Sequence, residues 1–228
     1  MSFPRPCVLH AMRTLAVNTF MSLDGVMQAP GGPEEDPTGG FTLGGWAAPY
    51  FDEEMLARIA SSGDYELLLG RRTYEIFAAH WPYDGGPIAD HLNSTRKHVA
   101  SRTLKQLEWS NSTLIEGDVA DYVAELKRQD GPEIQVHGSP GLIQTLLEND
   151  LIDEYRLWTF PLVLGTGKRF FGDGAIPAAL ELVDSTVSKT GVTIGIYRRA
   201  GSIEPGSMEF EEPTEAEIER RRRLAGES

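Results

Sequence analysis

The sequence predicts a single α/β domain, a three-layer α/β/α sandwich whose sheet is mostly parallel and ends in a C-terminal antiparallel hairpin. Short apolar runs alternate with amphipathic segments from residue 15 to residue 148, which is typical of parallel strands with helices on both faces. Two strand-like runs joined by a Lys-Thr-Gly turn follow at residues 180–199, which indicates a hairpin. The 228 residues suffice for one sizeable core.

The first strand is expected at residues 15–20 (LAVNTF). A glycine- and proline-rich loop follows at 22–45, and loops of this length are usually functional or disordered. A helix is expected at 49–60, with acidic residues in its first turn, where the helix dipole favours them. Further strands are expected at 65–69, 98–100, 112–115, 133–136, 153–160, 180–188 and 192–199. Further helices are expected at 73–79, 88–95, 119–128 and 141–148.

The two ends of the chain differ from this pattern. Residues 1–11 hold two prolines and a short apolar patch, and we expect a flexible leader there. The folded domain is expected at 12–200. Residues 201–228 contain eight acidic residues and four arginines, which indicates a solvated tail. Thr214 and Glu217 have the spacing of a capping box, so a short helix is expected at 218–224.

Composition excludes several classes of protein. The net charge of −13 argues against nucleic acid or an anionic membrane as a partner, because both need a basic face. The single cysteine, Cys7, allows neither an intramolecular disulfide nor a cysteine metal cluster, and the five histidines lack zinc-binding spacing. No run of 18 apolar residues occurs, so no membrane span is expected. We therefore expect a cytoplasmic protein without a metal.

Three strand ends are candidate phosphate sites. At the first, Gly70 separates a buried strand from a helix that begins with Arg71, Arg72 and Thr73. The free N–H groups of a helix N-terminus bind phosphate, and arginine and threonine add further donors. The alternative is a solvated helix start with surface arginines.

The second candidate is Ser101 with Arg102 at the end of a short strand, where an arginine distinguishes NADP from NAD binding. The alternative is an ordinary turn.

The third candidate follows the strand at 133–136 and comprises Gly138, Ser139, Gly141 and Leu142. Ser139 is expected to cap the helix, with Pro140 as its first residue. The alternative is a well-capped structural helix. No Gly-x-Gly-x-x-Gly motif is present. The three candidates are more informative together, because ligands bind at the carboxyl ends of strands in open α/β sheets.

The order of six segments resembles the dihydrofolate reductase superfamily, and most closely the C-terminal reductase domain of the riboflavin-biosynthesis deaminase-reductase. The segments are 21–26 (MSLDGV), 70–75 (GRRTYE), 101–102 (SR), 137–139 (HGS), 151–157 (LIDEYRL) and 161–171 (PLVLGTGKRFF). The resemblance spans residues 12–199. Two features depart from it: His137-Gly138-Ser139 replaces the usual Glu-Gly-Gly, and no zinc deaminase motif is present.

The resemblance implies a reductase domain that transfers hydride from NADPH to a C=N or carbonyl group, without a metal or flavin. The expected substrate is a small pterin-, pyrimidine- or sugar-like molecule, of the kind used in riboflavin biosynthesis. A homodimer is expected. Two alternatives stay open, a non-catalytic module that binds a nucleotide or pterin, and a dihydrofolate reductase proper.

The resemblance also suggests residue roles. The adenosine phosphate is expected at Arg71, Arg72, Ser101 and Arg102, and the remaining phosphates at the turns around Gly70 and residues 138–141. The nicotinamide is expected between Asn18 and the loop that holds Gly165 and Gly167.

The first candidate for a proton donor or substrate anchor is Asp24, and the second is Glu54. Burial raises the pKa of a carboxyl group, so that it can stay protonated and donate. The alternatives are a turn cap before Gly25 for Asp24 and a favourable helix-dipole interaction for Glu54. Trp46, Tyr50, Phe51 and Trp81 are candidates to stack on a planar substrate, or else belong to the core.

Overall fold

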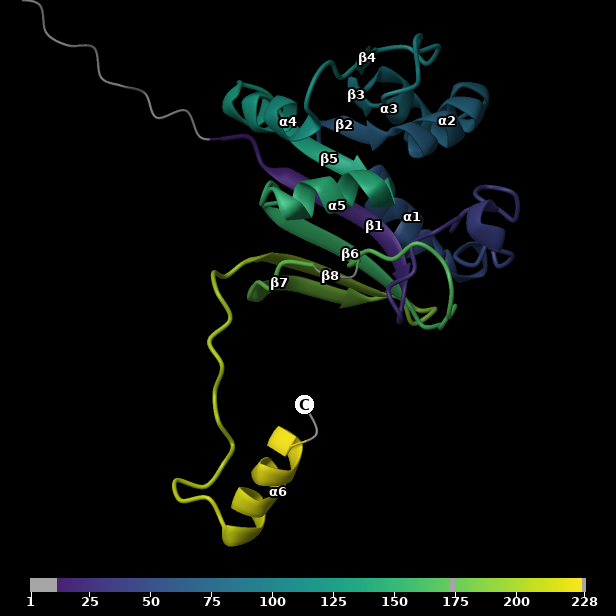
Figure 1. The fold of residues 1–228 in the computed structure, drawn as a ribbon. Coiled ribbons are helices and arrows are strands. Elements are labelled where there is room, and N and C mark those ends of the chain that lie inside the picture. The colour runs from purple at the N-terminus through teal and green to yellow at the C-terminus, as the bar shows by residue number, and fades with distance from the viewer. Residues whose placement is uncertain (1–11, 173–174, 227–228) are drawn as a thin grey trace, which may run out of the picture.

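A computed structural model describes residues 12–172 and 175–226, so the expected leader at 1–11 lies outside the described residues. The fold is built on one sheet of eight strands in the order β4-β3-β2-β5-β1-β6-β8-β7 (Figure 1). The strands are β1 Leu15–Ser22, β2 Tyr65–Gly70, β3 Lys97–Ala100, β4 Ser112–Leu114, β5 Glu133–His137, β6 Glu154–Phe160, β7 Leu180–Val187 and β8 Thr193–Arg199.

The sheet is parallel from β4 through β6 and antiparallel where β8 pairs with β6 and with β7. This confirms the predicted fold class, including the C-terminal hairpin. β1 lies between β5 and β6, where Asn18 is in register with both His137 and Arg156. Because paired residues on parallel strands point to the same face, these three side chains form a row across the middle of the sheet.

Helices cover both faces of the sheet (Figure 1). α4 and α5 pack on one face through a core that includes Val123, Leu146 and Val136. α1, α2 and α3 lie on the other face, where Met55, Tyr74 and Leu92 join two further apolar clusters. The helices are α1 Glu53–Ala60, α2 Arg71–His80, α3 Pro87–Ser94, α4 Val119–Arg128, α5 Pro140–Glu148 and α6 Glu215–Gly226, with single 3-10 turns at Thr38–Gly40, Ala48–Tyr50 and Trp81–Tyr83.

The starts of α1 and α2 differ from the sequence prediction. Ala48–Tyr50 forms a separate 3-10 turn, and α1 begins at Glu53 because the Asp52 carboxylate accepts a hydrogen bond from the Met55 N–H. α2 begins at Arg71, directly after Gly70 and two residues earlier than expected. The β2 strand therefore runs into the helix without a loop, which brings the start of α2 to the edge of the sheet.

The long loop after β1 packs on the protein rather than leaving it. Its buried residues Val26, Phe41 and Trp46 join a cluster with Phe160 of β6, and the Trp46 and Phe160 rings meet edge to face with centroids 5.2 Å apart. The indole N–H of Trp46 donates to the Gln28 carbonyl at 2.7 Å. The loop is thus anchored by its own aromatic core, and residues 27–36 lie at the side of the cavity described below.

The C-terminal tail runs away from the sheet, and α6 stands apart from the domain (Figure 1). The Thr214 hydroxyl accepts a hydrogen bond from the Glu217 N–H at 3.3 Å, as expected for a cap. The helix is longer than the predicted 218–224 and exposes nearly all of its side chains. Within the described residues, no helix has both the length and the apolar character that a membrane crossing requires.

Candidate functional site

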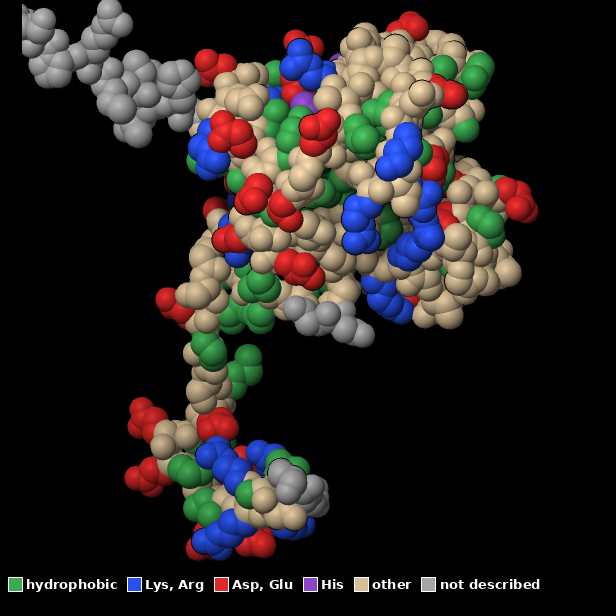
Figure 2. All heavy atoms as spheres, turned by 45° about the horizontal axis from the view of Figure 1, so that its top comes forward, with side chains coloured by type: hydrophobic (Ala, Val, Ile, Leu, Met, Phe, Trp, Pro, Cys, Tyr) green, Lys and Arg blue, Asp and Glu red, His purple; other side chains and the backbone are tan. Residues whose placement is uncertain are grey.

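A cavity of about 1590 Å³ opens at the carboxyl ends of the parallel strands. Its walls come from the ends of β1, β2, β3 and β5, the first turns of α2, α4 and α5, and the loop after β1. Lys and Arg side chains gather around a hollow on this face (Figure 2), and those that line the cavity are Arg71, Arg72, Arg102, Lys168 and Arg169. The acidic chain therefore carries a local cationic rim.

The starts of α2 and α5 are locked together at one wall of the cavity. The Ser139 hydroxyl accepts from the Gly70 N–H at 2.9 Å and donates to the His137 carbonyl at 3.0 Å. The Ser139 N–H donates to the Thr73 hydroxyl at 2.9 Å. Gly138 has a φ of +53°, and a Cβ there would lie 3.2 Å from the Thr73 hydroxyl oxygen. This position needs glycine because the two turns touch.

These contacts correct the expected role of Ser139. Its backbone is left-handed, with a φ of 64°, and its hydroxyl holds β2 instead of capping α5. No described side chain caps either α2 or α5, whereas Asp52 caps α1 and Asp118 caps α4. The Gly70 N–H is also used internally, so the N–H groups open to an anion begin at Arg71. First-turn N–H groups without a partner attract phosphate.

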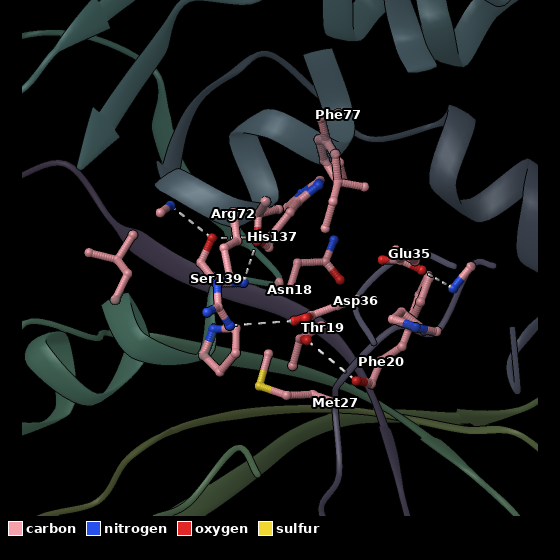
Figure 3. A pocket seen from close by; sticks show the side chains of 18 of the residues that line it. Asn18, Thr19, Phe20, Met27, Glu35, Asp36, Arg72, Phe77, His137 and Ser139 are labelled. Atoms are coloured by element: carbon pink, nitrogen blue, oxygen red, sulfur yellow. Dashed lines mark hydrogen bonds and ion pairs between the residues drawn. The ribbon is translucent and has the colours of Figure 1, made fainter. Parts of the chain in front are cut away.

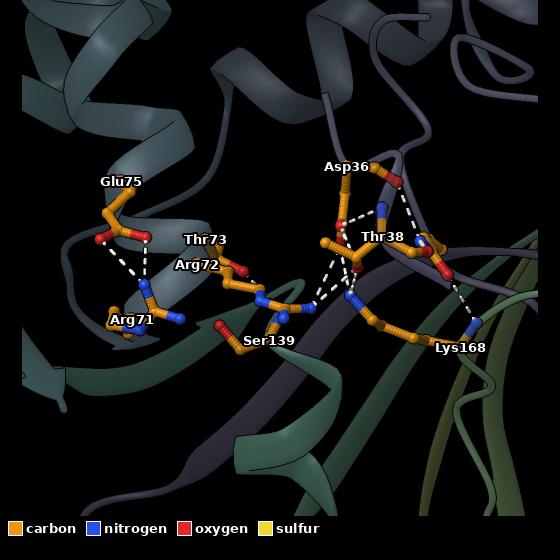
Figure 4. Close-up of polar contacts among 9 residues, drawn as sticks. Asp36, Thr38, Arg71, Arg72, Thr73, Glu75, Ser139 and Lys168 are labelled. Atoms are coloured by element: carbon orange, nitrogen blue, oxygen red, sulfur yellow. Dashed lines mark hydrogen bonds and ion pairs between the residues drawn. The ribbon is translucent and has the colours of Figure 1, made fainter. Parts of the chain in front are cut away.

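The three predicted arginines differ in how far they are already engaged. Arg71 pairs with Glu75 at 3.0 Å, one turn along α2. Arg72 donates to the Thr38 hydroxyl at 2.9 Å and lies 4.0 Å from the Asp36 carboxylate (Figure 4). Arg102 is exposed and makes no ion pair within the described part of the chain. Arg102 is therefore the cation most available to a ligand.

Ser101, beside Arg102, can donate a hydrogen bond to the same ligand. Its hydroxyl oxygen accepts from the Thr103 and Leu104 N–H groups at 3.2 and 3.0 Å. A hydroxyl that accepts two hydrogen bonds retains its own proton as a donor. Ser101 can therefore donate to an anion that Arg102 attracts.

Further into the cavity the walls become aromatic. Phe20, Phe51 and Trp158 line it and meet edge to face, with Phe20 centroids 5.4 Å from Phe51 and 5.6 Å from Trp158. Phe77 lies at the opposite wall (Figure 3). Of the four aromatic residues expected to stack on a substrate, Phe51 and Trp81 line the cavity, whereas Trp46 and Tyr50 pack against Phe160 in the core.

Two uncharged polar side chains lie in this part of the cavity, beside the Asp36 carboxylate, which is paired with Lys168. Asn18 and His137 lie side by side on β1 and β5, and both side chains line the cavity (Figure 3). Burial, with a smaller contribution from the nearby Arg156 and His91, lowers the pKa of His137 to about 4. Burial raises the pKa of Tyr65, which also lines the cavity, to about 12. This part of the cavity suits an uncharged planar molecule.

Asp24 does not have the properties expected of a proton donor. A hydrogen bond from the Ser22 hydroxyl at 2.6 Å lowers its pKa to about 2, and the N–H groups of Leu164 and Gly165 lower it further, against the opposing effect of burial. The expected rise in pKa is therefore wrong. The described residues that line the cavity do not include Asp24. Its carboxylate joins two loops, which agrees with the alternative of a turn-stabilising residue.

Glu54, Gly165 and Gly167 also fall outside the cavity wall. Glu54 is exposed on α1, which presents Leu56, Ile59 and Ala60 to the cavity instead. The Gly165 N–H donates to Asp24 at 2.9 Å. At Gly167 a Cβ would lie 2.6 Å from Val26, so this glycine serves packing. The expected cofactor residues that do line the cavity are Asn18, Gly70, Arg71, Arg72, Thr73, Ser101, Arg102, Gly138, Ser139, Gly141 and Leu142.

Sequence reasoning did not identify several of the residues that line the cavity. Lys168 donates to the Asp36 carboxylate and, at 2.9 Å, to the Thr38 hydroxyl (Figure 4), so it ties the loop after β1 to the loop after β6. Thr38 and Lys168 are 130 positions apart in the sequence, so no local pattern could have indicated this contact. His137 begins the segment 137–139. The alternation of side chains along β5 predicts that His137 lies on the same face of the sheet as Gln135.

The sequence matches the family model described as the RibD C-terminal domain over residues 13–194. YyaP of Bacillus subtilis strain 168, an uncharacterized protein, is 26% identical over 198 residues, 83% of this chain and 96% of YyaP. YwjB of the same strain, also uncharacterized, is 26% identical over 123 residues, 53% of this chain and 61% of YwjB. A crystal structure from Shewanella sp. PV-4, of a protein provisionally named for riboflavin biosynthesis, is 24% identical with a TM-score of 0.58 over 82% of this chain and 98% of that one, which shows a shared fold.

Proposed function

The chain belongs to the RibD C-terminal domain family, and from that premise we propose that it is an NADPH-dependent reductase. The proposed reaction transfers a hydride from NADPH to a C=N or carbonyl group of a small pterin-, pyrimidine- or sugar-like substrate, as in riboflavin biosynthesis. The family assignment supports the general class of activity, and the cofactor and the substrate are the further step that we propose.

The observation that carries the proposal is that one cavity contains two chemically different ends. Among the described residues, one end has an arginine without an ion pair, a serine hydroxyl and two helix starts without side-chain caps. The other end has aromatic walls and the uncharged side chains of Asn18 and His137. A cavity for one drug-sized ligand has a volume of about 300–1,000 Å³, and this one measures about 1590 Å³. It has room for a dinucleotide and a second, planar molecule together.

Each end has a defined task in this proposal. Ser101 and Arg102 bind the adenosine phosphate, and the first turns of α2 and α5 bind the remaining phosphates. The nicotinamide ring lies beside Asn18, and bound NADPH supplies the hydride. The protein mainly orients both molecules and excludes water from the aromatic end.

The geometry disfavours a dihydrofolate reductase proper. That assignment requires a carboxylate on the first helix to contact the pterin, and Glu54 is exposed, while α1 turns apolar side chains toward the cavity. The substrate is therefore expected to be held without a carboxylate from α1.

Calorimetric titration with NADPH and with NADH tests the proposal. Wild type should bind NADPH more tightly than NADH, and Arg102→Ala should weaken NADPH binding about tenfold or more, since hydrogen bonds to charged groups contribute about 1.5–3 kcal/mol. Affinity for NADH should not change. Lys105→Ala, an exposed lysine outside the cavity wall, is the matched control. Failure to bind either nucleotide would contradict the proposal and favour a non-catalytic module for another ligand.

We also propose that the reductase acts in the cytoplasm as a homodimer. The edge strand β7 exposes Leu182, Val183 and Val187, and exposed apolar residues on an edge strand are typical of a surface that a partner covers. Sedimentation equilibrium should give twice the mass of the chain. A monomer at micromolar concentration would contradict the dimer without bearing on the cofactor.

A further inference from the structure

The neutral end of the cavity contains two polar side chains with fixed hydrogen-bonding roles. Asn18 and His137 are register partners on β1 and β5, and neighbouring strands lie about 4.8 Å apart. Both side chains line the cavity (Figure 3). The two side chains can therefore converge on neighbouring polar atoms at one edge of a flat molecule.

Trp158 fixes the orientation of the Asn18 amide. The indole N–H, which can only donate, lies 2.9 Å from Asn18 Oδ1. The carbonyl oxygen of the amide must therefore face Trp158. Its NH₂ group has no hydrogen-bond acceptor within the described part of the chain, so Asn18 offers a donor to the cavity.

A relay of three residues fixes the tautomer of His137. Arg156 donates to both carboxylate oxygens of Glu133, at 2.7 and 2.6 Å, so both oxygens act as acceptors. Glu133 therefore accepts from the Gln135 NH₂ group at 2.7 Å. The Gln135 carbonyl is then turned toward His137 Nε2, 2.9 Å away. His137 must carry its proton on Nε2, and Nδ1 must be a bare acceptor.

The bare nitrogen is left for a ligand. Among the described residues, none forms a hydrogen bond with His137 Nδ1. Burial and the positive charge of Arg156 also oppose a second proton on the ring, because they lower the pKa of His137 to about 4. The acceptor is thus retained across the physiological range of pH.

We propose that Asn18 and His137 form a donor–acceptor pair that selects one edge of the substrate, and that Gln135 is the positioning residue that sets the acceptor. The pair fits a neutral group with a hydrogen-bond acceptor beside an N–H or O–H donor, as in a cyclic amide. A carboxylate offers no donor to His137 and is rejected. This proposal rests on the proposed function, which assigns this end of the cavity to the substrate. It adds the residues that select the substrate.

A non-reducible probe separates this pair from the cofactor site. Quinazolinedione carries two cyclic amide N–H groups, and its N,N-dimethyl derivative has the same ring without them. Titrations with and without NADPH should show that wild type binds the first compound about tenfold or more tightly than the second. His137→Phe should weaken binding of the first compound only, because only that compound has an N–H to donate. Asn18→Asp should weaken binding of the first compound as well, because it removes the donor to the ring carbonyl. Asn149→Asp, an exposed asparagine at the end of α5, should leave both affinities unchanged.

The outcomes distinguish the two proposals. If NADPH binds but the two probes bind equally, the donor–acceptor pair is wrong and the reductase proposal stands. If the probes differ as expected but NADPH does not bind, the pair stands and the cofactor proposal is wrong.

Nitrogen-15 NMR of the histidine rings tests the relay without a ligand. Near neutral pH, His137 should show a proton on Nε2, and Gln135→Leu should give a mixture of tautomers and the same loss of probe selectivity. Gln129→Leu, at an exposed glutamine after α4, should change neither. A wild-type ring with its proton on Nδ1 would overturn the inference even if every variant failed to fold.

Discussion

Asp24 provides a sharp test of whether a carboxylate near the cleft serves structure or chemistry. It accepts hydrogen bonds from the Ser22 hydroxyl and from the Leu164 and Gly165 N–H groups, at 2.6, 3.0 and 2.9 Å. Replacement by asparagine removes the charge and one acceptor oxygen while it preserves the shape. We expect Asp24→Asn to lower the free energy of unfolding and to leave the affinity for NADPH within about twofold of wild type, because the residues that line the cavity in the described structure exclude Asp24.

The magnitude follows from the pKa of the carboxyl group. A pKa lowered from 3.8 to about 2 corresponds to at most about 2.5 kcal/mol, at 1.36 kcal/mol per pKa unit. The side chain is 18% exposed and much of its environment is solvated, so screening reduces the contribution to about 1–2 kcal/mol. Urea unfolding near neutral pH should show this loss in the variant.

The pH dependence has a definite sign. Because the pKa is lower in the folded protein, the stabilisation is present above the unfolded pKa and is lost as the pH falls through the folded value. About half of the difference between wild type and Asp24→Asn should disappear by a pH of about 3. Equal stability of the two proteins near neutral pH would refute the structural role. A loss of turnover with unchanged stability would restore Asp24 as a proton donor.

Three further variants test single side chains. Gly167→Ala should cost about 2 kcal/mol or more in urea unfolding, because the φ of +121° disfavours alanine and the new Cβ would lie 2.6 Å from Val26; unchanged stability would contradict this packing. Glu54→Gln should leave NADPH-dependent turnover within about twofold of wild type, since Glu54 is exposed on α1, and a tenfold fall in kcat/KM would show that it reaches the substrate. Asp36→Asn should speed amide hydrogen exchange in residues 31–45 several-fold, because it removes the ion pair with Lys168. Asp90→Asn, at an exposed position, is the control. Equal exchange rates in Asp36→Asn and wild type would mean that the aromatic core alone holds the loop.

The order of the elements could be predicted because each strand is a short apolar run with a clear break after it. The ends of elements were harder to place. β1 extends to Ser22, two residues beyond the apolar run, because Ser22 pairs with Phe160 of β6, a partner 138 residues away. The start of α1 depends on which residue caps the helix. Pro49 suits the first turn of a helix, but Asp52 is the cap, so Pro49 lies in the preceding 3-10 turn. Such choices are made by tertiary contacts and leave little trace in local sequence.

The convergence of three strand ends at one cavity could be predicted because the carboxyl ends of parallel strands meet at one edge of the sheet. Gly70, Ser101 and Gly138 converge there as expected. The direction of the Asp24 pKa shift could not be predicted, because it depends on hydrogen bonds, and Leu164 donates to Asp24 from 140 residues away. The role of Ser139 was wrong because its left-handed backbone turns the hydroxyl toward β2.

We propose that one cleft holds NADPH with its adenosine phosphate at the end of β3 and its nicotinamide beside β1. A crystal structure of the NADPH complex tests it most directly. The adenosine phosphate is expected within hydrogen-bond reach of Ser101 and Arg102. The remaining phosphates are expected at the first turns of α2 and α5, and the nicotinamide next to Asn18. A nucleotide bound in the opposite direction, or outside this cleft, would contradict it.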